Sequence, residues 1–196
     1  MIRKIKKYKI TIHPHGVLKL LKKNPDSGSN GEELEKKVRD EIARVQSLIV
    51  PSAIYSSYSK SETPAALQSV WQSASAQALS LSFLLVSVGS ALEKEIEKRK
   101  AETNPAGAAL LESIGQESLE QSLHFVTKLL SEEAKSESCE LSPVCPVERS
   151  LWSSLLPFLE SPKADILLDE SGQMVPLYTS ASYCFWNPLP KGRNAR

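Results

Sequence analysis

The sequence has little or nothing of the features that mark several large classes of protein. Its 196 residues contain three cysteines, Cys139, Cys145 and Cys184, which are too few for a disulfide framework. Lysine and arginine number 24 and aspartate and glutamate 23, so no cationic excess indicates a general nucleic-acid binder. No apolar run reaches the roughly 18–20 residues of a membrane helix, because serines interrupt the longest, residues 79–89. Residues 1–9 are basic but no apolar signal core follows them, so we predict a reduced, cytoplasmic protein.

Common catalytic and ligand-binding motifs are also absent. There is neither a Walker A sequence nor a GxGxxG stretch, so no phosphate cradle is indicated. His13 and His15 would share one side of a strand, but no third ligand is close, and we predict no metal site. Cys139 and Cys145 are too far apart for a CxxC pair. The basic residues 1–9 are compatible with contact to an acidic partner, although a solvated tail is the simpler interpretation.

Apolar residues recur at helical spacing in several segments. Residues 32–49 carry a stripe with steps of three or four, and two glutamates at their start suit the helix dipole. Residues 105–133 begin with a proline and carry a second stripe, beside which Ala108, Ala109 and Gly115 would let another backbone approach closely. The same reasoning predicts further helices at residues 17–21, 65–76, 91–100 and 147–159.

Strand patterns are scattered between these helices. We predict strands at residues 8–13, 53–58, 79–88, 164–168 and 175–186, a loop at residues 24–31 and a turn at residues 169–172. The strands do not alternate with helices in a strict βαβ rhythm, which favours an α+β fold over a doubly wound one. We expect one domain over residues 1–196, with residues 1–7 and 189–196 frayed.

One C-terminal segment carries a family resemblance. Residues 169–176 read Asp-Glu-Ser-Gly-Gln-Met-Val-Pro, and an aromatic strand follows up to residue 188. This segment resembles the reactivation domain of cobalamin-dependent methionine synthase, which carries Glu-Ser-x-x-Met-x-Pro before a strand of small and aromatic residues. Six residues fall in step without a gap: Glu170, Ser171, Met174, Pro176, Phe185 and Pro188.

Weaker matches extend the resemblance to roughly residues 8–190. Ser142-Pro143, followed by Cys145-Pro146, resembles the family's Arg-x-(Ser/Ala)-Pro-Gly-Tyr element and the Cys-Pro or Trp-Pro after it. Residues 86–93, 109–115 and 51–55 resemble a strand end, a helix and a strand of the family.

The resemblance implies a helmet-like α+β fold, with flanking helices around a twisted antiparallel sheet. It also implies an activity, because the family domain binds S-adenosylmethionine against a corrinoid whose cobalt has become inactive. One electron and a methyl group then restore the methylated corrinoid, and the chemistry belongs to the cofactor. The chain is too short to hold homocysteine, folate and cobalamin modules as well. We therefore expect a stand-alone relative that serves a corrinoid-binding protein, or the catalytic modules of methionine synthase, in trans.

The same resemblance implies a cleft for S-adenosylmethionine. The residues expected to line it are Ser142, Pro143, Glu170, Ser171, Tyr183, Cys184 and Phe185.

Two departures from the family pattern bear on that cleft. In the family an arginine meets the carboxylate of S-adenosylmethionine, and Glu140 stands in that place here. Val144 replaces the family's glycine, and the tyrosine after it is missing. We therefore expect weak or absent binding of S-adenosylmethionine in the family's mode. An alternative is a non-catalytic module that docks on a corrinoid protein, and a third is a pocket repurposed for another small molecule.

Overall fold

The computed structural model describes residues 1–21 and 31–189. The loop predicted at residues 24–31 and the tail predicted to be frayed at residues 189–196 therefore lie almost entirely outside the described residues.

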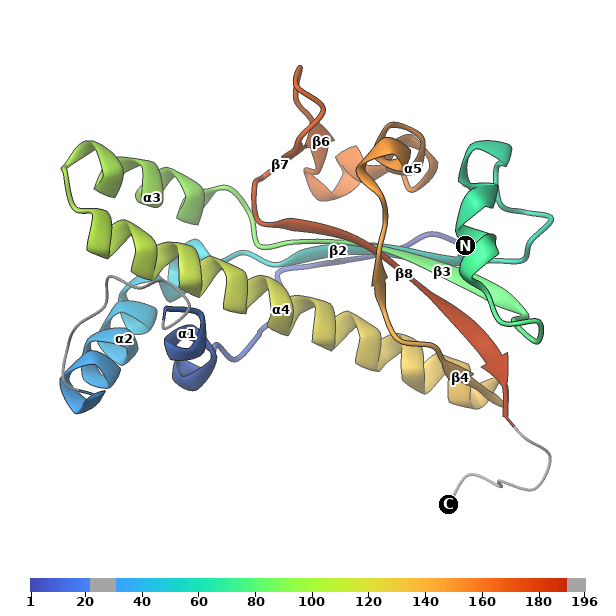
Figure 1. Ribbon diagram of the computed structural model, residues 1–196, viewed down its shortest axis with the longest axis horizontal. Coiled ribbons are helices and arrows are strands. Elements are labelled where there is room, and N and C mark those ends of the chain that lie inside the picture. Colours follow the sequence, from blue (N-terminus) through green and yellow to red (C-terminus); the bar gives the residue numbers. More distant parts are fainter. Residues whose placement is uncertain (22–30, 190–196) are drawn as a thin grey trace.

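An antiparallel sheet organises the fold (Figure 1). Its main path runs in the order β1-β2-β3-β8-β4, and every recorded pairing is antiparallel. A short strand, β5, pairs with β8 beside this path. The strands are β1 (Arg3–Lys6), β2 (Ser52–Tyr58), β3 (Ser80–Ser87), β4 (Cys139–Leu141), β5 (Cys145–Pro146) and β8 (Thr179–Pro188).

The central strand β3 is buried on both of its faces. From Leu81 to Ser87 every side chain is buried, which explains why its sequence is a nearly continuous apolar run rather than an alternating one. A sheet buried on both sides needs a cover on each face, and the chain supplies two different covers.

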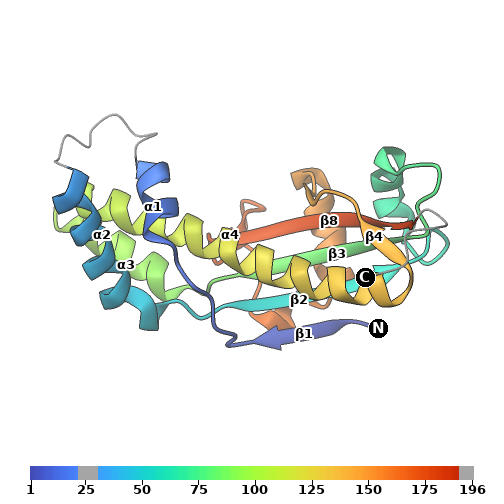
Figure 2. The same ribbon diagram turned by 90° about the horizontal axis from the view of Figure 1, so that it is seen from below.

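One face of the sheet is covered by α4 (Pro105–Ser136), which runs along it in both views (Figures 1 and 2). The helix begins where Asn104 Oδ1 accepts a hydrogen bond from the Gly107 backbone N–H at 2.9 Å, with Pro105 in the first turn. Leu84, Val126 and Leu130 are fully buried where helix and sheet meet. Although α4 has 32 residues, no helix in the described part of the chain is both long and apolar enough to span a membrane.

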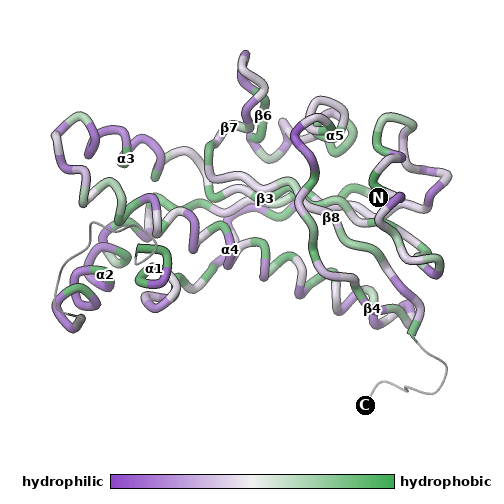
Figure 3. The backbone as a smooth tube through the Cα atoms, viewed as in Figure 1, coloured by the Kyte–Doolittle hydropathy of each residue, from purple (hydrophilic) through white to green (hydrophobic). Residues whose placement is uncertain are grey.

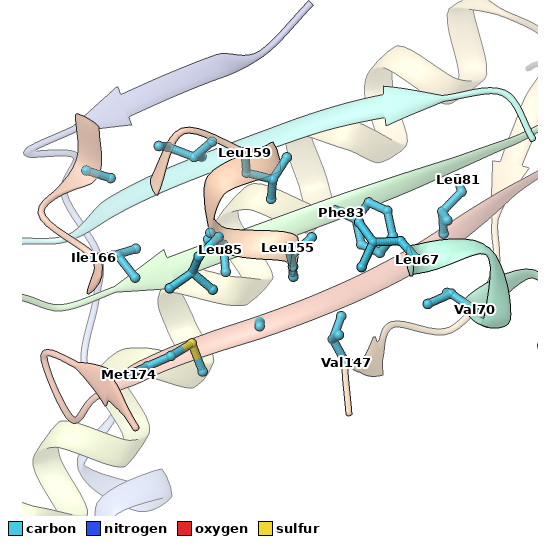
Figure 4. Close-up of a cluster of buried hydrophobic side chains, with 14 of the residues drawn as sticks. Leu67, Val70, Leu81, Phe83, Leu85, Val147, Leu155, Leu159, Ile166 and Met174 are labelled. Carbon is cyan, nitrogen blue, oxygen red and sulfur yellow. The ribbon is translucent and has the colours of Figure 1, made fainter. Parts of the chain in front are cut away.

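The opposite face is covered by short elements. These are η2 (Ala65–Ser73), α5 (Trp152–Phe158) and η4 (Ser161–Ala164). Figure 4 shows Leu67 of η2 and Leu155 of α5 packed over Phe83 and Leu85 of β3. The side chains here come from segments far apart in sequence, so this cover depends on the tertiary fold.

A second group of helices packs on the first half of α4, away from the sheet (Figure 2). It consists of α1 (Pro14–Leu21), α2 (Gly31–Val45), η1 (Gln46–Leu48) and α3 (Ala91–Ala101). Most of α3 is hydrophilic (Figure 3), and Arg99 pairs with Glu41 of α2 and Glu95 of its own helix. Gly115 of α4 lies against Tyr178, where a Cβ would come within 2.7 Å of the tyrosine ring. The approach predicted at this glycine was that of another backbone, whereas the structure places a tyrosine ring there.

Most predicted elements are present, with shifted bounds. The strands at residues 53–58 and 79–88 and the helices at residues 17–21, 32–49, 91–100 and 105–133 are confirmed. The segment predicted as a helix at residues 65–76 is the 3-10 helix η2. The helix predicted at residues 147–159 is split into η3 (Arg149–Leu151) and α5.

The N-terminal strand was predicted at the wrong position. Residues 8–13 form no strand, while Arg3–Lys6, which we expected to be frayed, pair with β2 as β1. Lys7 has a φ of 56°, so the backbone leaves the sheet direction there. A basic segment is compatible with a strand at this place because edge strands commonly carry charged side chains, lysine above all.

The C-terminal strands were also shifted. The strand predicted at residues 164–168 shrinks to β6 (Leu167–Leu168), and β7 (Met174–Val175) pairs with it. The strand predicted at residues 175–186 is divided into β7 and β8, because residues 176–178 leave the strand conformation. The turn predicted at residues 169–172 joins β6 to β7 and is confirmed.

Candidate functional site

Neighbouring side chains of β8 lie on opposite faces of the sheet. Cys184 and Trp186 belong to the buried cluster under α4, whereas Phe185 belongs to the cluster on the other face. Tyr183 packs beside Phe185 on that second face, with ring centroids 5.6 Å apart. This alternation follows from the two-residue repeat of a strand.

A segment some forty residues earlier pairs with the edge of β8, beside Tyr183 and Phe185. The Ser142 backbone N–H donates to the Phe185 carbonyl at 2.8 Å, and the Phe185 N–H donates to Ser142 Oγ at 3.0 Å. Cys145 then pairs with Tyr183, and the Val147 N–H donates to the Ala181 carbonyl at 2.9 Å. The predicted Ser142-Pro143 element is thereby held against the predicted aromatic strand.

A groove of about 230 Å³ opens between these two segments, and we call it the β8 groove. It is lined by Ser73, Ser75, Ser142, Pro143, Cys145, Tyr183, Phe185 and Asn187. Four of the predicted cleft residues are among these eight. The volume is below the usual 300–1,000 Å³ of a pocket for a small molecule, so a ligand of that size would extend beyond the groove.

The groove combines aromatic rings with hydroxyl and amide groups. Phe185 is supported from behind by Trp71, with ring centroids 5.4 Å apart. Tyr183 Oη and Ser73 Oγ lie 3.0 Å apart and share a hydrogen bond, and Ser75 Oγ donates to Asn187 Oδ1 at 2.7 Å. Flat rings with a few polar groups at the edge suit a ligand that has a planar base and a sugar.

Glu140 brings an acidic group to the same side of the sheet. It is exposed on β4 and pairs with Asn187, a groove residue, so both side chains lie on one face. No lysine or arginine is among the described residues that line the groove. A ligand carboxylate at this end would meet a negative charge in place of the guanidinium that such a group requires.

Glu170 and Ser171 lie elsewhere, at the tip of the β6–β7 hairpin. Asp169 Oδ1 accepts hydrogen bonds from the Ser171 N–H, the Ser171 hydroxyl and the Gln173 N–H, at 2.7–2.9 Å. These bonds, with that from Ser171 Oγ foremost, lower the pKa of the Asp169 carboxyl. Arg149 donates to the Ser171 carbonyl at 2.9 Å. The polar groups of this turn therefore hold the turn together, and neither Glu170 nor Ser171 lines the β8 groove.

Cys184 does not line the groove either. Its side chain is completely buried under α4 among apolar neighbours. Burial raises the pKa of the Cys184 thiol to about 12. The resemblance alone assigned Cys184 to the cleft, and the alternation of the strand places it on the face opposite Tyr183 and Phe185.

Sequence reasoning missed four groove residues: Ser73, Ser75, Cys145 and Asn187. Asn187 follows the matched strand at a two-residue step from Phe185, so strand alternation alone would have indicated it. Ser73 and Ser75 come from the end of η2 and the residues after it, and nothing in their local sequence marks them. Cys145 belongs to the Cys-Pro pair that the resemblance matched, to which no ligand contact was assigned.

The possible metal ligands noted in the sequence do not form a metal centre in the described residues. Within residues 1–21 and 31–189, no three or more histidine, cysteine, aspartate or glutamate side chains converge as metal ligands. His13 and His15 line a separate open groove beside Glu117 and Lys19.

Comparison with known proteins bears on the fold. No sequence family profile matches the chain, and no curated protein matches it in sequence. Among solved structures it is similar to the crystal structure of the MetH reactivation domain bound to AdoHcy, with a TM-score of 0.65. The two are 10% identical, and the match covers 97% of this chain and 80% of that one. The chain thus has the α+β fold of the methionine synthase reactivation domain, as the sequence resemblance implied.

Proposed function

We propose that this chain is an accessory protein for a corrinoid-binding protein. In this proposal it works in the cytoplasm and in trans, and it supports reductive methylation of the corrinoid with S-adenosylmethionine as methyl donor. The observation that carries the proposal is the convergence of Ser142-Pro143 with Tyr183 and Phe185 on one groove. These segments are far apart in sequence, and the resemblance assigned both to one ligand.

The groove fits one end of S-adenosylmethionine better than the other. The rings of Tyr183 and Phe185 and the hydroxyls of Ser73 and Ser142 suit the adenosyl group. Among the described groove residues there is no arginine for its carboxylate, and Glu140 stands on that side of the sheet. The methyl group would come from the ligand and the reducible metal from the partner's corrinoid. The role of this chain would be to hold the ligand and to exclude water from it.

A second candidate function is docking on a corrinoid protein without S-adenosylmethionine. The exposed Glu140 and the lack of a cation among the described groove residues favour it. An ionised carboxylate near a ligand carboxylate opposes binding, whereas the fold can persist through its packing alone.

Calorimetric titration of S-adenosylmethionine tests the proposal. The parent chain should bind S-adenosylmethionine weakly. The Glu140→Arg variant should bind it at least about 10-fold more tightly than the parent does, because a charged hydrogen bond contributes about 1.5–3 kcal/mol. Ser75→Trp should abolish binding by filling the groove. Glu132→Arg, which makes the same charge change on an exposed position of α4, serves as the matched control and should leave binding unchanged.

Binding that Ser75→Trp does not affect would contradict the assignment to the β8 groove. If neither the parent nor Glu140→Arg binds, the docking function remains. A titration with the cobalamin-loaded corrinoid-binding module of methionine synthase then tests that function. Micromolar binding would support it, and no binding would eliminate both candidates.

A further inference from the structure

The first 25 residues of the chain are strongly basic. They contain eight lysines and arginines and no aspartate or glutamate. Since the whole chain has a net charge of +1, the remaining residues carry a net charge of −7. This separation of charge is large for a nearly neutral protein. None of these basic residues is among those that line the β8 groove.

Part of this basic segment is an unpaired sheet edge. β1 pairs with β2, and it ends the recorded strand order of the described residues (Figure 2). The Lys7 backbone N–H donates to the Pro51 carbonyl at 2.8 Å, so in the alternating pattern Lys4 and Lys6 direct their N–H and C=O groups away from β2. The outer edge of β1 thus presents backbone donors and acceptors in strand geometry.

The lysines along this edge have few anionic partners. Lys6 pairs with the exposed Asp165 at 2.7 Å. Within the described part of the chain, Lys4, Lys7 and Lys9 make no ion pair. Desolvation and then repulsion from Lys6 lower the pKa of the Lys4 ammonium, so a nearby anion would relieve this crowding.

An apolar groove lies beside the end of the strand, and we call it the Val50 groove. Its volume is about 640 Å³, and it lies between residues 7–10 and residues 46–51. Ile10, Ile49 and Pro51 contribute apolar surface, and Lys7 and Lys9 stand on one side. The side chain of Val50 is 41% exposed there. The groove has room for a large apolar side chain from a segment that continues past β1.

We propose that the outer edge of β1 binds an extended acidic segment of a protein partner, which is added to the sheet as a further strand. Backbone groups of Lys4 and Lys6 would pair with the segment, acidic side chains would meet the lysines, and an apolar residue would enter the Val50 groove. This is recognition by strand addition, in which main-chain hydrogen bonds give affinity and side-chain contacts give selectivity. The inference is independent of the function proposed for the β8 groove.

Charge argues against two other occupants. A second copy paired through β1 would bring lysines opposite lysines, which destabilises a strand pair. A nucleic acid would approach a molecule whose remaining residues carry net negative charge, and it has no peptide backbone to pair with the edge. An acidic peptide strand satisfies both the charges and the backbone groups.

A fluorescence-polarisation titration with a seven-residue peptide tests the proposal. The peptide has blocked termini, glutamates at its odd positions, and valine, phenylalanine and valine at positions two, four and six. A peptide of equal charge with prolines in place of the valines cannot complete the ladder and should bind at least 5-fold more weakly. A triple variant with reversed charge at the edge should weaken binding at least 10-fold: Lys4→Glu, Lys7→Glu and Lys9→Glu. The control variant makes the same charge change at exposed positions elsewhere and should lose less than 2-fold: Lys60→Glu, Lys94→Glu and Lys128→Glu.

Hydrogen exchange gives a second readout that does not depend on a variant's folding. On saturation with the glutamate–valine peptide, the Lys4 and Lys6 amides of the parent should exchange at least 5-fold more slowly. Equal affinity for the proline peptide, or unchanged exchange at both amides, would overturn strand addition. Tighter binding of an oligothymidylate of equal charge would overturn it in favour of a polyanion site.

Discussion

The two faces of β8 differ in what packs on them. Cys184 and Trp186 are buried under one long helix, whereas Tyr183 and Phe185 face short segments that leave the β8 groove between them. The helix-covered face also has a groove of about 230 Å³, beside the last turn of α4 and lined in part by Trp186. On the other face, the β8 groove lies between separate short segments. The strand thus places one set of alternate side chains in a buried cluster under α4 and the other set along the β8 groove.

The largest expected difference between the faces is in cysteine reactivity. Burial raises the pKa of Cys184 to about 12, so at pH 8 its thiolate fraction is about 2,000-fold below that of an ordinary thiol with a pKa near 8.5. Cys145, which is half-buried at the groove, should react first with a thiol reagent. Mass spectrometry after timed labelling at pH 8 measures the order, with the unfolded chain as control. Labelling of Cys184 as fast as Cys145 would show that the helix-covered face opens readily.

Raising the pH should also weaken the fold. Because the folded state holds the Cys184 proton up to a pH of about 12, the unfolded state loses it first as the pH rises past about 9. Burial likewise raises the pKa of Tyr8 and of Tyr178 to about 12. Stability should therefore fall between pH 9 and pH 12, as measured by denaturant unfolding at each pH. A constant free energy of unfolding across this range would contradict the buried, protonated state of these groups.

Leu84→Ala should strongly destabilise the face under α4. Its side chain is fully buried, and its loss leaves a cavity between β3 and α4. The free energy of unfolding should fall by about 2–5 kcal/mol, as measured by urea denaturation. A loss below 1 kcal/mol would mean that this interface is loosely packed.

Trp186→Phe should have an intermediate effect on the same face. The Trp186 Nε1–H donates to the buried Ser82 Oγ at 2.7 Å, and phenylalanine cannot. Removing one partner of a buried hydrogen bond costs about 1–3 kcal/mol, measurable by the same denaturation. Double replacement with Ser82→Ala should cost less than the sum of the two single replacements, and strict additivity would contradict the coupling.

Tyr183→Phe should have the smallest effect, because it removes a hydroxyl from the partly open face. The hydroxyl shares a hydrogen bond with Ser73, whose side chain is exposed. The free energy of unfolding should change by less than about 1 kcal/mol. A larger loss would show that the groove face contributes to stability as much as the helix-covered face does.

Parts of this architecture were predictable because they rest on local patterns. The buried run at residues 79–88 and the start of α4 at Pro105 were both visible in sequence. The α+β class followed from the scattered strands. The edge strand β1 was missed because its alternation is carried by lysines rather than by apolar residues.

The candidate site was predictable only in part. The resemblance placed Ser142, Pro143, Tyr183 and Phe185 together, and the structure brings these four to one groove. It placed Glu170 and Ser171 with them, although both stand on a hairpin stabilised by Asp169. Ser73 and Ser75 line the groove because η2 packs beside it in the tertiary structure. No local sequence pattern predicts this packing.

The most direct test of the division between the faces of β8 is an NMR titration with AdoHcy that follows the tryptophan indole N–H signals. Trp71 lies behind Phe185 at the groove, whereas Trp186 is buried on the other face and bonded to Ser82. The account predicts a saturable shift of the Trp71 signal and an unchanged Trp186 signal. A shift of Trp186 without one of Trp71, or no shift of either at millimolar ligand, would contradict a ligand-binding face on β8.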